Sequence, residues 1–141
     1  MVQDNSSLPD LDAHLPPNDR RTSVLLAEDD RALRRFLEVV LERAGYQVFS
    51  ASDGLEAMKL VLSASIDVVV TDEMMPNLSG HEFCRFLRNS PTLSHLPIIL
   101  LSALQRKDTN SAEQADAFLT KPVAGEKLIE CIEKLLAKKN D

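Results

Sequence analysis

Acidic side chains end two of the apolar runs in this sequence. Residues 23–30 read SVLLAEDD and residues 68–76 read VVVTDEMMP, so each run passes directly into carboxylates. Burying a lone carboxylate at the end of a strand is costly unless a partner uses its charge. Ser102 supplies a hydroxyl after a later apolar run, and Lys121 supplies an ammonium group after the last one. Groups of these types can bind a cation and a phosphoryl group.

The acidic residues are suited to a hard metal ion. Glu28, Asp29 and Asp72 offer only oxygen atoms, and close carboxylates are driven toward protonation unless a cation compensates. A few carboxylates completed by water suit Mg²⁺ better than an all-protein Ca²⁺ site. Beside such an ion, Lys121 and Ser102 can stabilise the equatorial oxygens of a phosphoryl group. Asp72 is then the candidate nucleophile that receives it.

These residues are far apart along the chain, and a repeated strand-then-helix pattern predicts how they meet. Apolar runs that indicate strands occupy residues 23–30, 46–51, 66–72, 97–103 and 117–121. Helical spacing of apolar residues follows the first, second, third and fifth of these runs, while residues 105–116 offer few apolar contacts and predict only a short fourth helix. The alternation implies an α/β fold with a parallel sheet covered on both faces. Ligands of such sheets bind outside the carboxyl ends of the strands, where all the candidate residues stand.

Composition limits the class of protein. A chain of 141 residues with 44% apolar content and a net charge of -6 fits one globular domain, and the acidic balance argues against direct nucleic-acid binding. No run is long enough to span a membrane and no signal peptide is evident, so the predicted location is cytoplasmic, without membrane insertion. Cys84 and Cys131 are expected to be reduced. Residues 1–22, rich in proline and polar residues, are predicted to be a flexible tail or linker ahead of a domain at 23–141.

Four segments in order, LLAEDD, TDEMMPNLSG, IILLSA and FLTKP, resemble the receiver domain of two-component response regulators, the CheY-like domains of phosphorelay signalling. The resemblance covers residues 23–139. It implies a doubly wound five-stranded parallel sheet in the flavodoxin-like order 2-1-3-4-5. It also implies a domain that takes a phosphoryl group from a histidine kinase or histidine phosphotransfer protein and then controls a protein partner. Such a domain is a phosphoacceptor in signalling, not an enzyme that turns over a separate substrate.

The resemblance assigns a metal-binding role to four residues. Asp29 matches a direct Mg²⁺ ligand, and Glu28 matches a ligand that acts through water. Asp72 matches the phosphoacceptor, which also binds the metal. The backbone carbonyl of Met74 matches the group that completes the metal shell.

Further residues match the phosphoryl-binding and switch positions. Lys121 matches the phosphate-binding lysine, followed by a peptide bond that is usually cis in this family. Ser102 matches the switch hydroxyl and Phe118 the aromatic switch residue. The backbones of Met74 and Ala103 match groups that bind the phosphoryl oxygens. Partners are expected on the face made by the fourth helix, fifth strand and fifth helix.

Three features depart from the family pattern. Lys121 follows Ser102 by only nineteen positions, and Gln114 stands where the family has glycine, so the fourth helix is predicted to be shortened or frayed. Met74 and Leu104, at positions that flank the phosphoryl site, are both apolar. Apolar side chains there offer an attacking water little hydrogen bonding, which predicts a long-lived phosphoryl state.

Other readings remain open. An Asp-nucleophile phosphatase of the haloacid dehalogenase type needs a second acid at position 74, which is methionine, and a flavodoxin-like cofactor site would not carry the acidic residues 28–30. His81 and Cys84 could share a zinc ion, but they lack a second ligand pair. A further alternative is that the chain is the receiver segment of a hybrid histidine kinase. The end of the sequence at Asp141, without an output domain, favours a stand-alone regulator, while the tail at 1–22 leaves the hybrid open.

Overall fold

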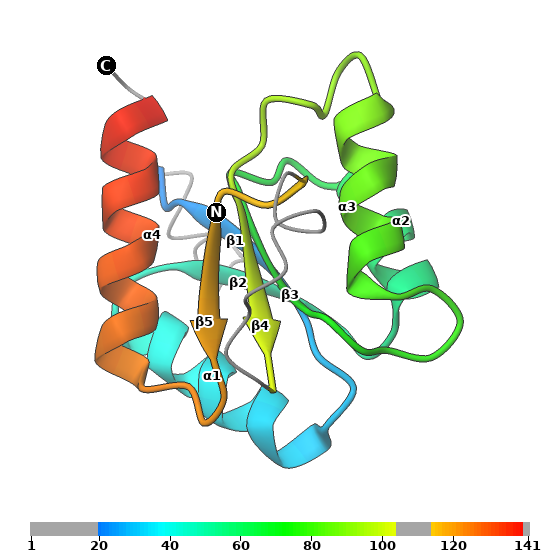
Figure 1. Cartoon of the computed structure of the whole chain (residues 1–141). Coiled ribbons are helices and arrows are strands. Elements are labelled where there is room, and N and C mark those ends of the chain that lie inside the picture. Colours follow the sequence, from blue (N-terminus) through cyan, green and yellow to red (C-terminus); the bar gives the residue numbers. More distant parts are fainter. Residues whose placement is uncertain (1–19, 104–113, 140–141) are drawn as a thin grey trace, which may run out of the picture.

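A computed structural model describes residues 20–103 and 114–139 of the chain (Figure 1). Strands and helices alternate within these ranges, as the apolar pattern predicts. The strands are β1 (Ser23–Ala27), β2 (Gln47–Ala51), β3 (Val68–Asp72), β4 (Ile98–Ser102) and β5 (Ala117–Thr120). The helices of the described ranges are α1 (Arg31–Arg43), α2 (Gly54–Ser63), α3 (Gly80–Asn89) and α4 (Gly125–Lys139).

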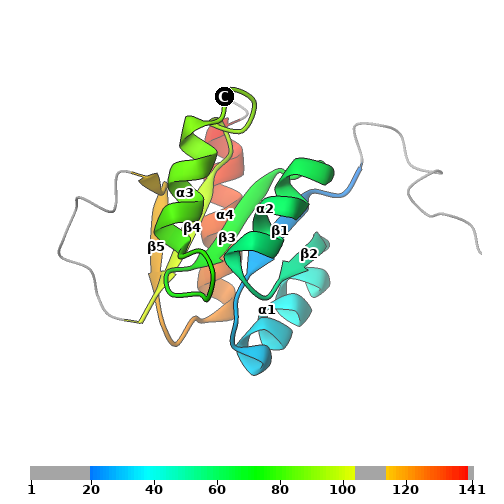
Figure 2. The same cartoon turned by 90° about the vertical axis from the view of Figure 1, so that its right-hand side faces the viewer.

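The strands form one parallel sheet in the order β2-β1-β3-β4-β5, which confirms the predicted α/β fold and strand order. Helices α1 and α4 cover one face of the sheet, and α2 and α3 cover the other (Figures 1 and 2). The order reverses at β1 and β3, because β2 lies outside β1 and the later strands lie on the other side of β3. The carboxyl ends of β1 and β3 are therefore adjacent, and both carry acids.

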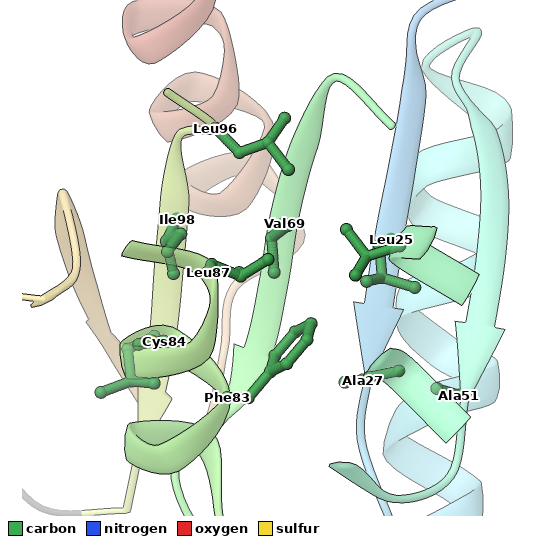
Figure 3. Packing of buried hydrophobic residues seen from close by; sticks show 12 residues of the cluster. Leu25, Ala27, Ala51, Val69, Phe83, Cys84, Leu87, Leu96 and Ile98 are labelled. Carbon is green, nitrogen blue, oxygen red and sulfur yellow. The ribbon is translucent and has the colours of Figure 1, made fainter. Parts of the chain in front are cut away.

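Apolar side chains on both faces of the sheet hold the helices in place. Val69 of β3 and Ile98 of β4 face α3, and Figure 3 shows Phe83, Cys84 and Leu87 of that helix packed over them. All five side chains are fully buried. Burying a large apolar side chain stabilises the fold by about 1.5–3 kcal/mol, so α3 is anchored firmly beside the end of β3.

The helix ends agree with the sequence. Asp30, which immediately precedes α1, accepts a hydrogen bond from the Leu33 backbone N–H at 3.1 Å and caps the helix. Gly45 follows α1 with a φ of 97°, a conformation that glycine adopts without strain. Ser79 and Glu82 form a complete capping box at the start of α3. The first turn of α3 is thus fixed in position next to the loop that follows β3.

Two predictions concern parts of the chain outside the described residues. Residues 1–19 of the predicted tail are not described, and the Thr22 carbonyl at its end accepts a hydrogen bond from Gln47 of β2 at 2.9 Å. Most of the predicted short fourth helix, at 105–116, falls on residues 104–113, which are also outside the described ranges.

Among the helices that are described, none has the length and apolar character needed to cross a membrane. Cys84 and Cys131 are free thiols, and burial raises the pKa of Cys84 to about 12.

Candidate functional site

The candidate residues come together because the sheet ladder continues one residue beyond the strands. The Glu28 N–H donates to the Ala51 carbonyl at 3.0 Å, and the Lys121 N–H donates to the Ser102 carbonyl at 2.7 Å. These backbone bonds fix the first residue after β1 and after β5 relative to the neighbouring strand. The side chains of Glu28 and Lys121 therefore start from defined positions at the carboxyl edge of the sheet.

Three carboxylates and one ammonium group meet at this edge. One oxygen each of Glu28, Asp29 and Asp72 lies within 4.8 Å of the others, an arrangement that can hold a metal ion. Lys121 Nζ lies 2.9 Å from Asp72 Oδ1 and 3.4 Å from Glu28 Oε1. Glu28 and Asp72 are buried, while Asp29 is exposed. The cluster is thus buried on the side of Glu28 and Asp72 and open to solvent on the side of Asp29.

Burial makes the cluster electrostatically unfavourable by itself. Desolvation of Glu28 raises the pKa of its carboxyl from 4.5 to about 7, with the nearby Asp72 carboxylate acting in the same direction. Desolvation also raises the pKa of Asp72, although Lys121 counteracts part of this effect. Partial burial lowers the pKa of Lys121, but its contacts with Asp72 and Glu28 outweigh that effect and raise it. One ammonium group therefore compensates only part of the buried negative charge.

The donor set fits a hard divalent cation. Glu28 Oε2 accepts a hydrogen bond from the Asp30 N–H at 3.0 Å, whereas the buried Oε1 has no hydrogen bond within the described part of the chain. A buried carboxylate oxygen without a hydrogen bond, beside two further carboxylates, is the type of site that Mg²⁺ occupies in proteins. The arrangement can thus bind Mg²⁺ and, with Lys121, an anionic group next to Asp72.

The loop after β3 follows the spacing of Asp, Pro and Gly seen in the sequence. The Gly80 N–H donates to the Glu73 carbonyl at 3.0 Å, and a Cβ atom at position 80 would lie 2.0 Å from the Asp72 carbonyl oxygen. Only glycine allows α3 to start this close to the loop that follows Asp72. Asn77, with a φ of 73°, lies in the turn between Asp72 and Gly80. Met74 in this loop is 72% exposed, so its side chain is available to the solvent in front of the site.

The predicted switch residues lie on the α3 side of the site. Ser102 is buried, and its hydroxyl donates a hydrogen bond to Glu73 Oε1 at 3.0 Å. Ala103, the next residue, is exposed. Phe118 of β5 is partly buried and packs against the apolar cluster on the α2 and α3 side of the sheet. The Lys121–Pro122 peptide bond is cis, as the resemblance implied.

Sequence reasoning missed Glu73 as a member of the site. It considered His81 only as a zinc ligand with Cys84, but His81 Nε2 lies 2.7 Å from Glu73 Oε2 and Cys84 is buried in the core. The strand register could have indicated the contact. Asp72 pairs with Leu101, so the next residue on each strand, Glu73 and Ser102, are neighbours on the same face.

Comparison with known sequences decides the family. The pattern of the family described as "Response regulator receiver domain" matches residues 24–133, most of the chain. The chain belongs to the response regulator receiver domains. This receiver domain is a phosphoacceptor module of two-component signalling and not a classical enzyme.

Relatives of the receiver domain include longer regulators. It is 41% identical over 116 residues to the response regulator MprA of Mycobacterium sp. (strain KMS), covering 80% of this chain and 50% of that protein. It is 40% identical over 108 residues to YrkP of Bacillus subtilis (strain 168), named an uncharacterized transcriptional regulatory protein, covering 74% of this chain and 45% of that one. The chain thus spans about half the length of these relatives.

Solved receiver structures have the same fold. The response regulator TrrA from Thermotoga maritima, in complex with Mg²⁺-BeF, has a TM-score of 0.75 at 31% identity, over 82% of this chain and 99% of that one. The signal receiver domain of a signal transduction histidine kinase from Syntrophus aciditrophicus has a TM-score of 0.75 at 30% identity, over 83% and 91%. Similar receivers thus come from response regulators and from a histidine kinase.

Proposed function

We propose that this receiver domain accepts a phosphoryl group on Asp72 from a phosphorylated histidine of a histidine kinase or phosphotransfer protein. The observation that carries the proposal is the placement of Lys121 Nζ 2.9 Å from Asp72 Oδ1, beside the oxygen cluster of Glu28, Asp29 and Asp72. An ionised carboxylate with an adjacent cation and a metal-binding set is suited to attack phosphorus and to bind the product.

The transfer exchanges one bond for another. A carboxylate oxygen of Asp72 forms a bond to phosphorus while the bond from phosphorus to the donor imidazole nitrogen breaks. The bonding electron pair stays on the imidazole, which is left able to take up a proton. Because only the ionised carboxylate is a nucleophile, Lys121 helps by opposing the rise in the pKa of Asp72 that burial causes.

Glu28, Asp29 and Asp72, with the backbone carbonyl of Met74, would hold Mg²⁺ in this receiver. When bound, the ion supplies positive charge for the carboxylates and for the phosphoryl oxygens. TrrA, at 31% identity, was solved in complex with Mg²⁺-BeF, which supports the choice of metal. Lys121 would also bind the phosphoryl oxygens.

The response to phosphorylation would use Ser102 and Phe118. The Ser102 hydroxyl moves to the phosphoryl group, with the backbones of Met74 and Ala103 completing its contacts, and Phe118 turns into the space that Ser102 leaves. A hydrogen bond to a charged group contributes about 1.5–3 kcal/mol, enough to shift a pre-existing equilibrium tenfold or more. Identical Ser102 positions and Phe118 rotamers in the free and phosphorylated forms would contradict this mechanism.

The downstream partner is proposed to be a protein that binds the face around β5 and α4, which is the fifth of the predicted helices. The predicted fourth helix, also expected on that face, lies mostly outside the described residues. The receiver would act in the cytoplasm as part of a response regulator, without direct contact to nucleic acid. Its similarity to the Syntrophus kinase receiver favours one alternative, in which it is the receiver segment of a hybrid histidine kinase.

The central experiment is chemical phosphorylation read by intact mass. We expect a single phosphoryl adduct after incubation with phosphoramidate or acetyl phosphate and Mg²⁺, and no adduct on the Asp72→Asn variant. Asp30→Asn is the matched control, because asparagine caps a helix as well as aspartate and Asp30 stands outside the metal cluster. A folded wild-type chain that takes no adduct from either donor would refute the proposal.

A further inference from the structure

A chain of three polar side chains lies beside the phosphoacceptor and is not explained by the metal site. The Ser102 hydroxyl donates to Glu73 Oε1 at 3.0 Å, and Glu73 Oε2 lies 2.7 Å from His81 Nε2. Both oxygens of the Glu73 carboxylate are therefore engaged, one by β4 and the other by α3. Glu73 thus links the predicted switch serine to a helix that is anchored in the core.

The strand register and the start of α3 place these three side chains next to one another. Glu73 and Ser102 each follow a paired residue of β3 and β4, and alternation directs both side chains to the face that α3 covers. His81 lies in the first turn of α3, where the bond from the Gly80 N–H to the Glu73 carbonyl brings the helix against the loop. The side chains of Glu73 and His81 are only 14% and 24% exposed. The carboxylate is therefore held in one orientation.

The direction of the hydrogen bond matters for the switch. A serine hydroxyl carries one proton, so the bond that Ser102 donates to Glu73 excludes a bond donated to a phosphoryl oxygen. The bond to Glu73 ends on a carboxylate oxygen, and it is largely shielded from water, which strengthens it. Phosphorylation of Asp72 must therefore offer the hydroxyl a better acceptor than Glu73.

Serine, glutamate and histidine also occur in nucleophilic triads, but in another order. In a triad the imidazole stands between the hydroxyl and the carboxylate and removes the hydroxyl proton. Here the hydroxyl bonds to the Glu73 carboxylate, and His81 bonds to the other oxygen of that carboxylate. This order positions a hydroxyl and does not activate it as a nucleophile.

We infer that Glu73 is a positioning residue that retains the Ser102 hydroxyl in the unphosphorylated state. His81 orients the Glu73 carboxylate, and the retained hydrogen bond raises the free energy needed to reach the activated state. The inference rests on the proposed function, since it assumes that Ser102 must reach a phosphoryl group on Asp72. Removing Glu73 should then make the activated state easier to reach.

Binding of beryllofluoride with Mg²⁺, measured by calorimetry, tests the inference. Four proteins are compared: the wild type, Glu73→Ala, Ser102→Ala and the double variant. Glu73→Ala should tighten binding about tenfold when Ser102 is present, and by about twofold or less in the Ser102→Ala background. The cycle isolates the hydrogen bond, because loss of the Glu73 charge near an anion acts in both backgrounds.

Two further variants cover loss of folding and the role of the histidine. Glu73→Gln keeps the shape but offers Ser102 an uncharged acceptor, so it should tighten binding by less than Glu73→Ala. His81→Ala should also tighten binding less than Glu73→Ala, because the carboxylate loses its orientation but remains. An equal effect of Glu73→Ala in both Ser102 backgrounds would overturn the inference and leave the phosphoacceptor function intact. Failure of the wild-type chain to bind beryllofluoride would overturn both.

Discussion

Replacement of Glu28 by glutamine should stabilise the metal-free protein at pH 8. Glu28 is fully buried, and its Oε1 has no hydrogen bond among the residues that the structure describes, although Lys121 Nζ lies 3.4 Å from it. Glutamine has the same shape, and its amide oxygen can accept the bond that the Asp30 N–H donates to Glu28 Oε2. The substitution therefore removes a buried charge while it keeps the packing.

The size of the effect follows from the pKa of Glu28. Burial raises this pKa from 4.5 to about 7, so between these pH values the folded protein holds a proton that the unfolded chain has lost. The contribution of Glu28 to stability is therefore greatest below pH 4.5 and is lost as the pH rises through 7. The shift corresponds to about 3 kcal/mol at pH 8. We expect a gain up to that size at pH 8 and little or none at pH 4.5.

Urea unfolding followed by circular dichroism, in buffers with EDTA, measures the free energies at both pH values. Glu38→Gln is a control of opposite sign: hydrogen bonds from Ser50 and Arg35 lower the pKa of Glu38, although slight burial opposes them. Its stabilising effect is present at pH 8 and is lost as the pH falls through its folded pKa, so glutamine should destabilise the protein at pH 8. Mg²⁺ should stabilise the wild-type protein more than the Glu28→Gln variant, because it binds the charge that the variant lacks.

The reasoning fails if Glu28→Gln gives no gain at pH 8 without metal. It also fails if the gain is the same at pH 4.5 and pH 8, because a difference independent of pH would reflect packing and not the charge of Glu28.

Three further predictions concern the loop after β3 and its surroundings. Gly80→Ala would place a Cβ 2.0 Å from the Asp72 carbonyl oxygen and should cost about 3 kcal/mol or more in urea unfolding, whereas Gly45→Ala meets no atom within 4 Å and should cost only about 1 kcal/mol for its positive φ. Equal losses would contradict the steric argument. Arg88 donates four hydrogen bonds to the segments on either side of β4, so Arg88→Ala should lose about 2–3 kcal/mol in the same assay, and a loss below about 0.5 kcal/mol would show that these bonds contribute little. Met74→Asn should shorten the lifetime of the adduct about tenfold, since an amide can orient an attacking water and a thioether cannot. Because Met74 is 72% exposed, the melting temperature of the protein should hardly change on this substitution. Decay of the adduct at an unchanged rate, followed by mass spectrometry, would refute the idea that Met74 excludes water.

The sequence by itself determined the fold and the three acids of the metal-binding cluster, Glu28, Asp29 and Asp72. Strands with apolar residues on both faces and helices with one apolar stripe are local patterns, and their alternation permits few arrangements other than a doubly wound parallel sheet. Once the sheet is parallel, residues that end strands must meet at one edge. For this reason the sequence alone predicts that Glu28, Asp72 and Lys121 lie close together. The long-lived phosphoryl state, predicted in part from Leu104, stays a prediction, since that residue is outside the described ranges.

Only the tertiary structure decided which partner each polar side chain takes. Ser102 is predicted to turn to the phosphoryl group only after phosphorylation, and the structure shows the bond that its hydroxyl makes otherwise: it donates to Glu73, a residue that no sequence motif indicated. The sequence suggests His81 only as a zinc ligand with Cys84, whereas in the structure its Nε2 lies 2.7 Å from Glu73 Oε2. The physical reason is that a hydrogen bond forms only over a few tenths of an ångström and a limited range of angles. The register of β3 against β4 and the depth of α3 set such distances, and both arise from packing contacts across the whole core.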